Sequence, residues 1–599
     1  MASTKDARKS TRANAEKGST APEMERWAAP PPTGLVRYLP IASWLPQYEW
    51  SKWLVVDFLA GMTVWGLIVP EAMGYASIAG MPLQAGLYTL VGTLVVYSLL
   101  GTSRQLVIAA TAAASSITAS VVAGLNPAGA GEYASMLGVV VLAVGLLFVL
   151  AGLLRLGFIA DFIPRPVMAG FVFGLGLFIM TKQAYKVLGL PKPSGSTVEM
   201  LASDIGNLGH ISWTTAAMGL GAIVVLLLFE RLLPRLPGAL IVLLGAIGLS
   251  AFLDLDDHGV EIVGEVPGGL PDFALPSLSG SDVPVLVAGA VGVMLVIMTE
   301  SLGGADNFAQ KHHYRVDTNQ ELIAQGFTNL TSGVLGGLAN GASLSSSSVN
   351  DNAGARTSLS LAVAWVLVIL TLLFLTPLFT NLPEAVLGAI VIVAVKGLIK
   401  VDEFKRFWRA YRNEFWLGTL TLVTVVAWDV LPAMVLGVVL AILMITYRAS
   451  RASVAVLARN PDAPEVWRDS ANHPDFETVN EILVLRLNAQ LFYANAESFV
   501  DEAKRLIGKA RPRGVVLDAE ATRVLDITGG EFLGRLVDDV QNEGIPFALA
   551  GLDAAVIEFA HRSGLLEQIG RENIYSTITQ AVEAVRGSPF EERKRDPIG

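Results

Sequence analysis

The chain of 599 residues contains no cysteine and only six histidines. Without cysteine it forms no disulfide and holds no metal through thiolates. The histidines form no cluster with ligand-like spacing, and the adjacent pair His312 and His313 is interpreted as solvated side chains in a loop. The sequence therefore predicts no resident metal and no cofactor.

Charge is also scarce. Only 16% of the residues are charged and 52% are hydrophobic, whereas soluble domains carry about 25% charged residues. This composition predicts an integral membrane protein. The formal net charge of -10 suggests a basic partner, but much of the acidity falls in a few loops and in the carboxy-terminal part, and we expect no nucleic-acid partner.

The amino-terminal part lacks the apolar run of about 7 to 15 residues that a secretory signal requires, since none occurs before Leu54. Residues 1–40 are rich in Ala, Pro, Ser and charge, which predicts a disordered cytosolic tail.

Residues 41–450 alternate apolar runs with short polar links and predict a transmembrane domain of about fourteen segments, two of them short or broken. Lysine and arginine gather in alternate links, such as 400–412, whereas the link 254–282 has none. By the positive-inside rule this places both termini in the cytoplasm. We expect the protein in a bacterial-type plasma membrane. Lys182, Lys186 and Lys192 depart from the pattern because they fall in an outside link.

The stretch from Gly336 to Gly354, GGLANGASLSSSSVNDNAG, is polar and glycine-rich between apolar segments. Irregular backbone at membrane depth is tolerated only where protein buries it or where it lines a cavity. The stretch is therefore a candidate binding site, with hydroxyl donors for an anion at five positions: Ser343, Ser345, Ser346, Ser347 and Ser348. The alternative is a polar loop outside the membrane.

The first half contains a similar stretch, Gln105 to Ser120, near the start of the third segment. Its counterpart in the second half occupies the tenth segment. Because each set has seven segments, an odd number, the sets (about 53–253 and 283–447) have opposite orientation and predict an inverted repeat. Two half-helix amino termini would then meet at the midplane around one site.

Two carboxylates fall in apolar segments. Glu300 ends the run VGVMLVIMT, and Glu71 follows Pro70 in the first segment. Ionisable groups within the membrane mark functional sites by default, and Glu300 is the candidate for proton coupling. The alternative is an inert, hydrogen-bonded position at the interface. Asp306 and Asn307 either face the same cavity or begin a cytoplasmic loop.

After Tyr447 the charge rises and short strand-like runs alternate with helical ones. This pattern predicts a small soluble α/β domain at 479–588, joined by a linker at 451–478 and followed by a tail at 589–599.

Several runs resemble the SulP anion-transporter family, to which prestin and pendrin belong: DFLAGMTVWGLIVPEAMGYASIAGMPLQAGLY from Asp57, TESLGGADNFAQ from Thr299 and YRVDTNQELIAQGFTNL from Tyr314. The run VVLDAEATRVLDITGG from Val515 resembles the family's STAS domain. The resemblance implies fourteen segments as a 7+7 inverted repeat divided into a core and a gate, a homodimer, and a cytoplasmic STAS domain. It places the site at Glu71, Tyr75, Thr111, Ala112, Glu300, Ser345 and Ser346.

Two positions depart from the family pattern. Ser346 stands where many relatives have arginine, and Glu71 where many have glutamine. Anion binding must then depend on helix dipoles, hydroxyls and a co-transported cation, so charge balance favours a coupling proton or sodium ion. In the STAS motif, Asp526 to Gly529 reads DITG, which lacks the phosphorylatable serine of soluble relatives but keeps Thr528.

We therefore expect a secondary active transporter of a small anion (sulfate, bicarbonate or a dicarboxylate) that works by proton- or sodium-coupled symport through alternating access and catalyses no covalent reaction. The alternatives are an uncoupled channel or exchanger, and a membrane-anchored anion sensor whose STAS domain recruits a soluble protein partner.

Overall fold

The computed structural model describes residues 39–587 except 159–163, 192–196, 234–236, 274, 277–282, 429 and 452–453. It forms two compact units, Met1–Val439 and Leu440–Gly599. Of the tail expected at 1–40, only residues 39 and 40 are described, and the tail expected at 589–599 lies outside the described residues, as does Lys192.

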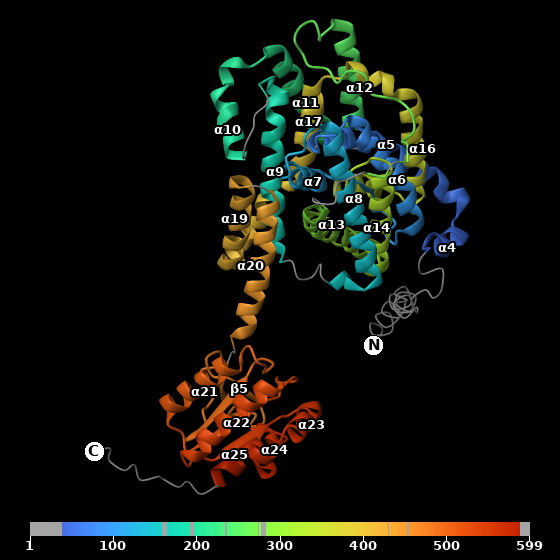
Figure 1. Cartoon of the computed structure of the whole chain (residues 1–599). Helices are drawn as coiled ribbons and strands as arrows, with labels where there is room; N and C mark the ends of the chain where they lie inside the picture. Colours follow the sequence, from blue (N-terminus) through green and yellow to red (C-terminus); the bar gives the residue numbers. More distant parts are fainter. Residues whose placement is uncertain are drawn as a thin grey trace, which may run out of the picture. The chain divides into compact units, whose positions relative to one another are not determined.

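The first unit is almost entirely helical (Figure 1). Its main helices are α5 (Trp50–Ile78), α6 (Leu83–Leu100), α7 (Ala112–Ala123), α8 (Ala130–Leu153), α9 (Arg165–Leu188), α10 (Thr197–Gly206), α11 (Trp213–Leu232), α12 (Gly238–Leu253), α13 (Val283–His312), α14 (Thr318–Val334), α15 (Leu344–Asn352), α16 (Leu359–Leu370), α17 (Glu384–Val395), α18 (Val401–Ala410), α19 (Arg412–Ala427) and α20 (Val430–Ser450). In the described part of the chain, seven helical stretches are long and apolar enough to cross a membrane, and α7 and α12 are shorter apolar helices. The expected polytopic helical membrane protein is confirmed.

The helices of this unit pack in two groups. In one, α14 packs against α6 and α8, α16 against α5 and α6, and α13 against α7 and α8. In the other, α9 packs against α11, α17 and α19 (Figure 1). The groups meet where α17 and α12 contact α5. Segments far apart in the sequence thus form each group, because helices from both halves interleave.

Close contact between α8 and α14 depends on glycine. A Cβ atom at Gly145 of α8 would lie 2.7 Å from the backbone nitrogen of Leu330, and one at Gly326 of α14 would lie 2.8 Å from the carbonyl oxygen of Gly145. Small residues let helix backbones approach closely where lipid supplies no hydrophobic driving force between helices. These glycines fix the spacing of two helices that lie next to the polar segments described below.

The start of α5 is fastened to the chain before α16 by one buried carboxylate. Asp57 is fully buried and accepts hydrogen bonds from the backbone amides of Arg356 (2.7 Å) and Thr357 (3.3 Å), from the Thr357 hydroxyl (2.8 Å) and from the Tyr48 hydroxyl (3.1 Å). Burial and the neighbouring Asp57 charge raise the pKa of the Tyr48 hydroxyl above its ordinary value. Tyr48 therefore remains a hydrogen-bond donor at any physiological pH.

The second unit contains a six-stranded sheet in the order β4-β3-β5-β6-β7-β8. Its strands are β3 (Val454–Arg459), β4 (Trp467–Asp469), β5 (Ile482–Leu487), β6 (Gly514–Asp518), β7 (Phe547–Ala550) and β8 (Ile574–Tyr575). The pairs from β5 to β8 are parallel. Five helices accompany the strands: α21 (Ala496–Ala510), α22 (Ile527–Asn542), α23 (Ala554–Arg562), α24 (Leu565–Ile569) and α25 (Ile578–Gly587). Separate apolar clusters cover the two faces of the sheet, so the predicted α/β domain is present.

The boundary of this domain differs from the expectation. The stretch 451–478, expected as a linker, contains β3 and β4, and β3 pairs antiparallel with β5. Ala455 and Leu457 are buried against the sheet, and so is Trp467. Strand β3 therefore extends the core of the domain, because its apolar side chains cover surface that β5 would otherwise expose.

Candidate functional site

The two polar stretches singled out in the sequence lie side by side. β1 (Ile108–Ala110) and β2 (Asn340–Ala342) form a two-stranded antiparallel ladder in which Ile108 faces Ala342 and Ala110 faces Asn340. Each strand leads directly into a short helix, β1 into α7 and β2 into α15. Because the strands run in opposite directions, the two helices leave the ladder at opposite ends, with both amino termini next to it.

Each of these helices begins with a hydroxyl cap. Thr111 accepts a hydrogen bond from the amide of Ala114 at 3.2 Å, and Ser343 accepts one from the amide of Ser346 at 3.3 Å. The uncapped backbone amides at a helix amino terminus, together with the positive end of the helix dipole, favour the binding of anions. Here two such amino termini flank one ladder.

Glu71 of α5 contacts the second helix directly. The hydroxyls of Ser345 and Ser346 donate to its two carboxylate oxygens, at 3.3 Å and 3.1 Å. Glu71 is only 4% exposed and Ser346 is fully buried, whereas Ser345 is exposed. Pro70, the preceding residue, has no amide hydrogen and leaves one carbonyl of α5 without its helical partner. The site thus combines a carboxylate, two hydroxyls and a helical turn that lacks one backbone hydrogen bond.

Tyr75 lies one turn beyond Glu71, on the same face of α5. It interacts electrostatically with both Glu71 and Glu300. Tyr75, Ala112 and Thr111 are buried. We use "central site" for the eight residues Glu71, Tyr75, Thr111, Ala112, Glu300, Ser343, Ser345 and Ser346.

Glu300 lies within α13 and is half-buried. In the described part of the chain its side chain has no hydrogen-bond partner, and it interacts electrostatically with Lys400. Asp306 and Asn307 are exposed residues of the same helix, which continues to His312. Glu300 is therefore a half-buried carboxylate without a hydrogen bond to any residue that the structure describes.

A polar layer behind the ladder was missed by the sequence analysis. The carbonyl of Asn340 in β2 accepts hydrogen bonds from the side-chain amides of Gln325 (2.6 Å) and Asn329 (3.0 Å), and the Asn340 amide donates to Asn329 at 3.0 Å. The Ala342 amide donates to Ser301 at 3.0 Å. These side chains satisfy backbone groups that a two-stranded ladder leaves unpaired in the membrane. Gln325 and Asn329, within a stretch predicted to span the membrane, were the available signal.

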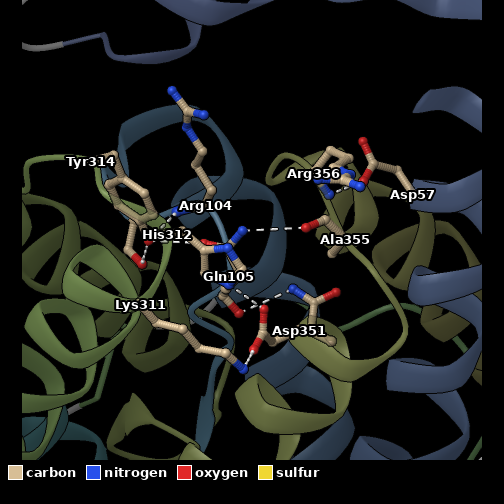
Figure 2. A network of polar contacts seen from close by, with 11 residues as sticks. Asp57, Arg104, Gln105, Lys311, His312, Tyr314, Asp351, Ala355 and Arg356 are labelled. Carbon is tan, nitrogen blue, oxygen red and sulfur yellow. Dashed lines mark hydrogen bonds and ion pairs between the residues drawn. The ribbon is translucent and has the colours of Figure 1, made fainter. Parts of the chain in front are cut away.

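A second polar cluster lies beside the entry to β1 (Figure 2). Tyr314 donates to the Gln105 side chain at 2.9 Å, and Gln105 donates to the carbonyl of Ala355 at 3.2 Å. Asp351 of α15 pairs with Lys311 and with His312, each at 2.5 Å (Figure 2). His312 was interpreted as a solvated loop residue, but it is the last residue of α13 and contacts a carboxylate, because the helix extends further than the apolar run predicted. This cluster joins the ends of α13 and α15.

Comparison with known proteins places these features in a family. The model of the sulfate permease family matches residues 54–421, more than half of the chain, and the model of the STAS domain matches 473–581. A probable sulfate transporter of Mycobacterium tuberculosis is 32% identical over 91% of this chain and 98% of its own length. A chloroplastic sulfate transporter of Arabidopsis thaliana is 29% identical over 91% and 82%, and human solute carrier family 26 member 6 is 31% identical over 79% and 65%.

Solved structures show the same fold. The inward-facing murine anion transporter Slc26a9 superimposes with a TM-score of 0.84 at 22% identity, over 92% of this chain and 95% of that one. The transmembrane domain of the cyanobacterial bicarbonate transporter BicA superimposes with a TM-score of 0.56 at 22% identity, over 65% and 96%. These relatives are transporters and not enzymes. The chain therefore belongs to the sulfate permease (SulP) family of membrane anion transporters and carries a STAS domain after its membrane part.

Proposed function

We propose that the protein is a cation-coupled symporter of a small oxyanion, with sulfate as the first candidate. The observation that carries the coupling is the pair of hydrogen bonds from Ser345 and Ser346 to the carboxylate of Glu71. These hydroxyls are the donors that an anion in the central site would need. The carboxylate and the substrate anion therefore compete for the same donors.

Charge makes this competition unfavourable for the anion unless a cation binds as well. Two like charges about 4 Å apart cost about 4 kcal/mol at an effective dielectric constant of about 20. No arginine stands at position 346 to offset Glu71. A proton on Glu71 would remove its charge, release the two serine hydroxyls and supply a further donor. Glu300, which lacks a hydrogen-bond partner among the described residues, is proposed as a second cation position for a proton or sodium ion.

The choice of substrate is supported by the relatives. Those from Mycobacterium tuberculosis and Arabidopsis thaliana are named sulfate transporters, and BicA is named a bicarbonate transporter. Bicarbonate and dicarboxylates remain the competing substrates. A doubly charged anion needs more compensating charge than bicarbonate does, which suits a site with two titratable carboxylates.

We further propose that alternating access moves one helix group against the other. The core would contain α5, α6, α7, α8, α13, α14, α15 and α16. The gate would contain α9, α11, α12, α17, α19 and α20. In chain order, the seven of these helices in the first half and the seven in the second half would form the two inverted sets. The strand-then-helix order of β1 with α7 and of β2 with α15 supports the repeat.

The membrane topology can be tested with single cysteines at Arg409 and Asp272, because the chain has no cysteine of its own. Only the first should react from the cytoplasm if both termini lie inside.

The decisive experiment is uptake of radiolabelled sulfate, bicarbonate and a dicarboxylate into proteoliposomes under imposed pH or sodium gradients. Coupled symport predicts accumulation of one anion above equilibrium, driven by one gradient. Uptake that only equilibrates the anion would identify a channel or exchanger. Binding without uptake, with ligand-dependent capture of a soluble partner by the STAS domain, would identify a sensor.

Glu71→Gln provides the internal test of the coupling mechanism, since it removes the charge and keeps the shape. We expect anion binding that no longer depends on pH and no accumulation driven by a proton gradient. Glu265→Gln, at an exposed loop position, is the matched control. Cross-linking in the membrane would test the expected homodimer.

A further inference from the structure

A short basic helix precedes α19, which packs against the candidate membrane span α9. α18 (Val401–Ala410) ends directly before α19 (Arg412–Ala427), with only Tyr411 between them. The segment from 400 to 416 carries five basic residues, Lys400, Lys405, Arg406, Arg409 and Arg412, against three acidic ones, Asp402, Glu403 and Glu414. Its net charge is therefore positive, in a chain whose overall charge is negative.

One face of α18 is fixed to the helix bundle. Phe404 and Phe407 are buried, and the ring of Phe404 packs edge-on against Phe173 of α9, with centroids 5.4 Å apart. The Phe404 ring also lies 6.1 Å from that of Phe415 in α19. These contacts hold α18 in one orientation, so its remaining side chains project from a fixed surface.

Exposed aromatic side chains lie at the end of α18 and at the start of α19. Trp408 is 46% exposed, Tyr411 67% and Trp416 59%. Trp408 packs edge-on against Phe415 at 4.8 Å, which fixes its indole while leaving its outer side open. Tryptophan and tyrosine with one apolar and one wet side are enriched at the headgroup level of membranes.

Three arginines on this surface lack an acidic partner within the part of the chain that the structure describes. Lys405 pairs with Asp402 at 3.1 Å and Lys400 with Glu403 at 3.8 Å. Arg406, Arg409 and Arg412 are exposed and form no ion pair with any residue that the structure describes. The Arg412 guanidinium instead lies 5.3 Å from the centre of the Trp408 ring. Their charges are thus available to a ligand.

We propose that α18 and the first turn of α19 form a binding surface for anionic lipid headgroups in the leaflet where α18 lies. Arginine forks match phosphate geometry, and basic residues beside amphipathic aromatic ones are the pattern that attracts anionic lipids. Lipid is favoured over a soluble acidic protein because α19 packs along α9, a candidate membrane span, directly after α18. The arginines and Trp408 therefore stand where a bilayer has its headgroups.

The test measures lipid selectivity of the purified full-length protein in vesicles. Spin-labelled phosphatidylglycerol and spin-labelled phosphatidylcholine are compared in phosphatidylcholine vesicles, and the immobilised fraction gives a relative association constant. We expect the parent to prefer phosphatidylglycerol by roughly threefold at low salt, and the preference to fall at about 0.5 M salt. Arg406→Gln/Arg409→Gln/Arg412→Gln should bring the ratio to about 1.

Two variants serve as controls. Arg406→Lys/Arg409→Lys/Arg412→Lys keeps the charge, and we expect it to retain a preference for phosphatidylglycerol. Lys509→Gln/Arg511→Gln/Arg523→Gln removes three exposed charges from the other unit, and its selectivity should equal that of the parent. A glutamine triple variant with parental selectivity would overturn the proposal. So would loss of dimerisation in that variant at unchanged lipid selectivity, since this would assign the surface to a second copy of the chain.

Discussion

The hydroxyl of Ser346 donates a hydrogen bond to Glu71 at 3.1 Å across 275 positions of the sequence. Ser346 is thus already engaged by the carboxylate of Glu71. At these two positions the resemblance to the family implies arginine and glutamine in many relatives. The two positions that depart from the pattern implied by the family resemblance therefore meet in one contact.

Removing the two serine hydroxyls tests whether they bind the substrate. We expect Ser345→Ala/Ser346→Ala to weaken anion binding at least about tenfold, because each hydrogen bond to a charged group contributes about 1.5 to 3 kcal/mol. The measurement is equilibrium binding of the transported anion to the purified protein. Ser348→Ala is the matched control, since the Ser348 hydroxyl donates to Leu344 of its own helix. Equal affinity in the double variant and the control would remove α15 from the site.

Arginine at position 346 should separate anion binding from coupling. In Ser346→Arg the guanidinium would balance Glu71, so an anion no longer requires a proton to neutralise the site. We expect affinity at least equal to that of the parent and a weaker dependence of uptake on the pH or sodium gradient. Uptake and affinity are compared across imposed gradients. If both stay unchanged in a folded variant, position 346 does not face the substrate.

Glu300→Gln tests the second cation position. The substitution removes a titratable group but keeps a polar side chain of similar shape, so we expect gradient-driven accumulation to fail while anion binding persists within about threefold. A threefold change in affinity corresponds to less than about 1 kcal/mol of binding free energy. The loss of a direct contact between Glu300 and the anion would cost more than this. Accumulation with an unchanged pH dependence would show that Glu300 does not bind the proton.

Asp57 should stabilise the membrane unit. Asp57→Ala leaves the buried amide and hydroxyl of Thr357 without their acceptor, and unsatisfied buried donors cost about 1 to 3 kcal/mol each. We expect a clearly lower unfolding temperature in detergent. Tyr48→Phe removes one bond of 3.1 Å and should destabilise by only about 1 kcal/mol. An equal effect of the two variants would contradict the central role of the carboxylate.

Deleting Arg451–Gly599 should spare anion binding. The residues of the central site all belong to the first compact unit, Met1–Val439. The deletion removes the whole sheet of the second unit, including β3 and β4, so no partial domain remains. We expect binding affinity in the inserted, folded truncation to match that of the full chain, while transport rate or partner capture falls. Complete loss of affinity would show that the STAS domain contributes to the site.

The sequence by itself determined the class of protein and indicated which stretches form the candidate site. Scarce charge and repeated apolar runs require a polytopic membrane protein, because such a chain cannot remain soluble. A polar, glycine-rich stretch such as Gly336 to Gly354 must be buried or line a cavity at membrane depth. The alternation of strand-like and helical runs after Tyr447 likewise determined the α/β domain, though not its first strand.

Only the tertiary structure decided which distant residues meet. The pairing of Ile108 with Ala342 and the contact of Glu71 with Ser346 depend on how the helices of the two halves interleave. No local pattern encodes such contacts, because they join residues more than 200 positions apart. The support of β2 by Gln325 and Asn329 spans only 15 and 11 positions, but it too depends on how β2 folds back onto α14. A side-chain amide in a predicted membrane helix indicates a hydrogen bond to another buried group. Which group that is depends on the packing of the helices.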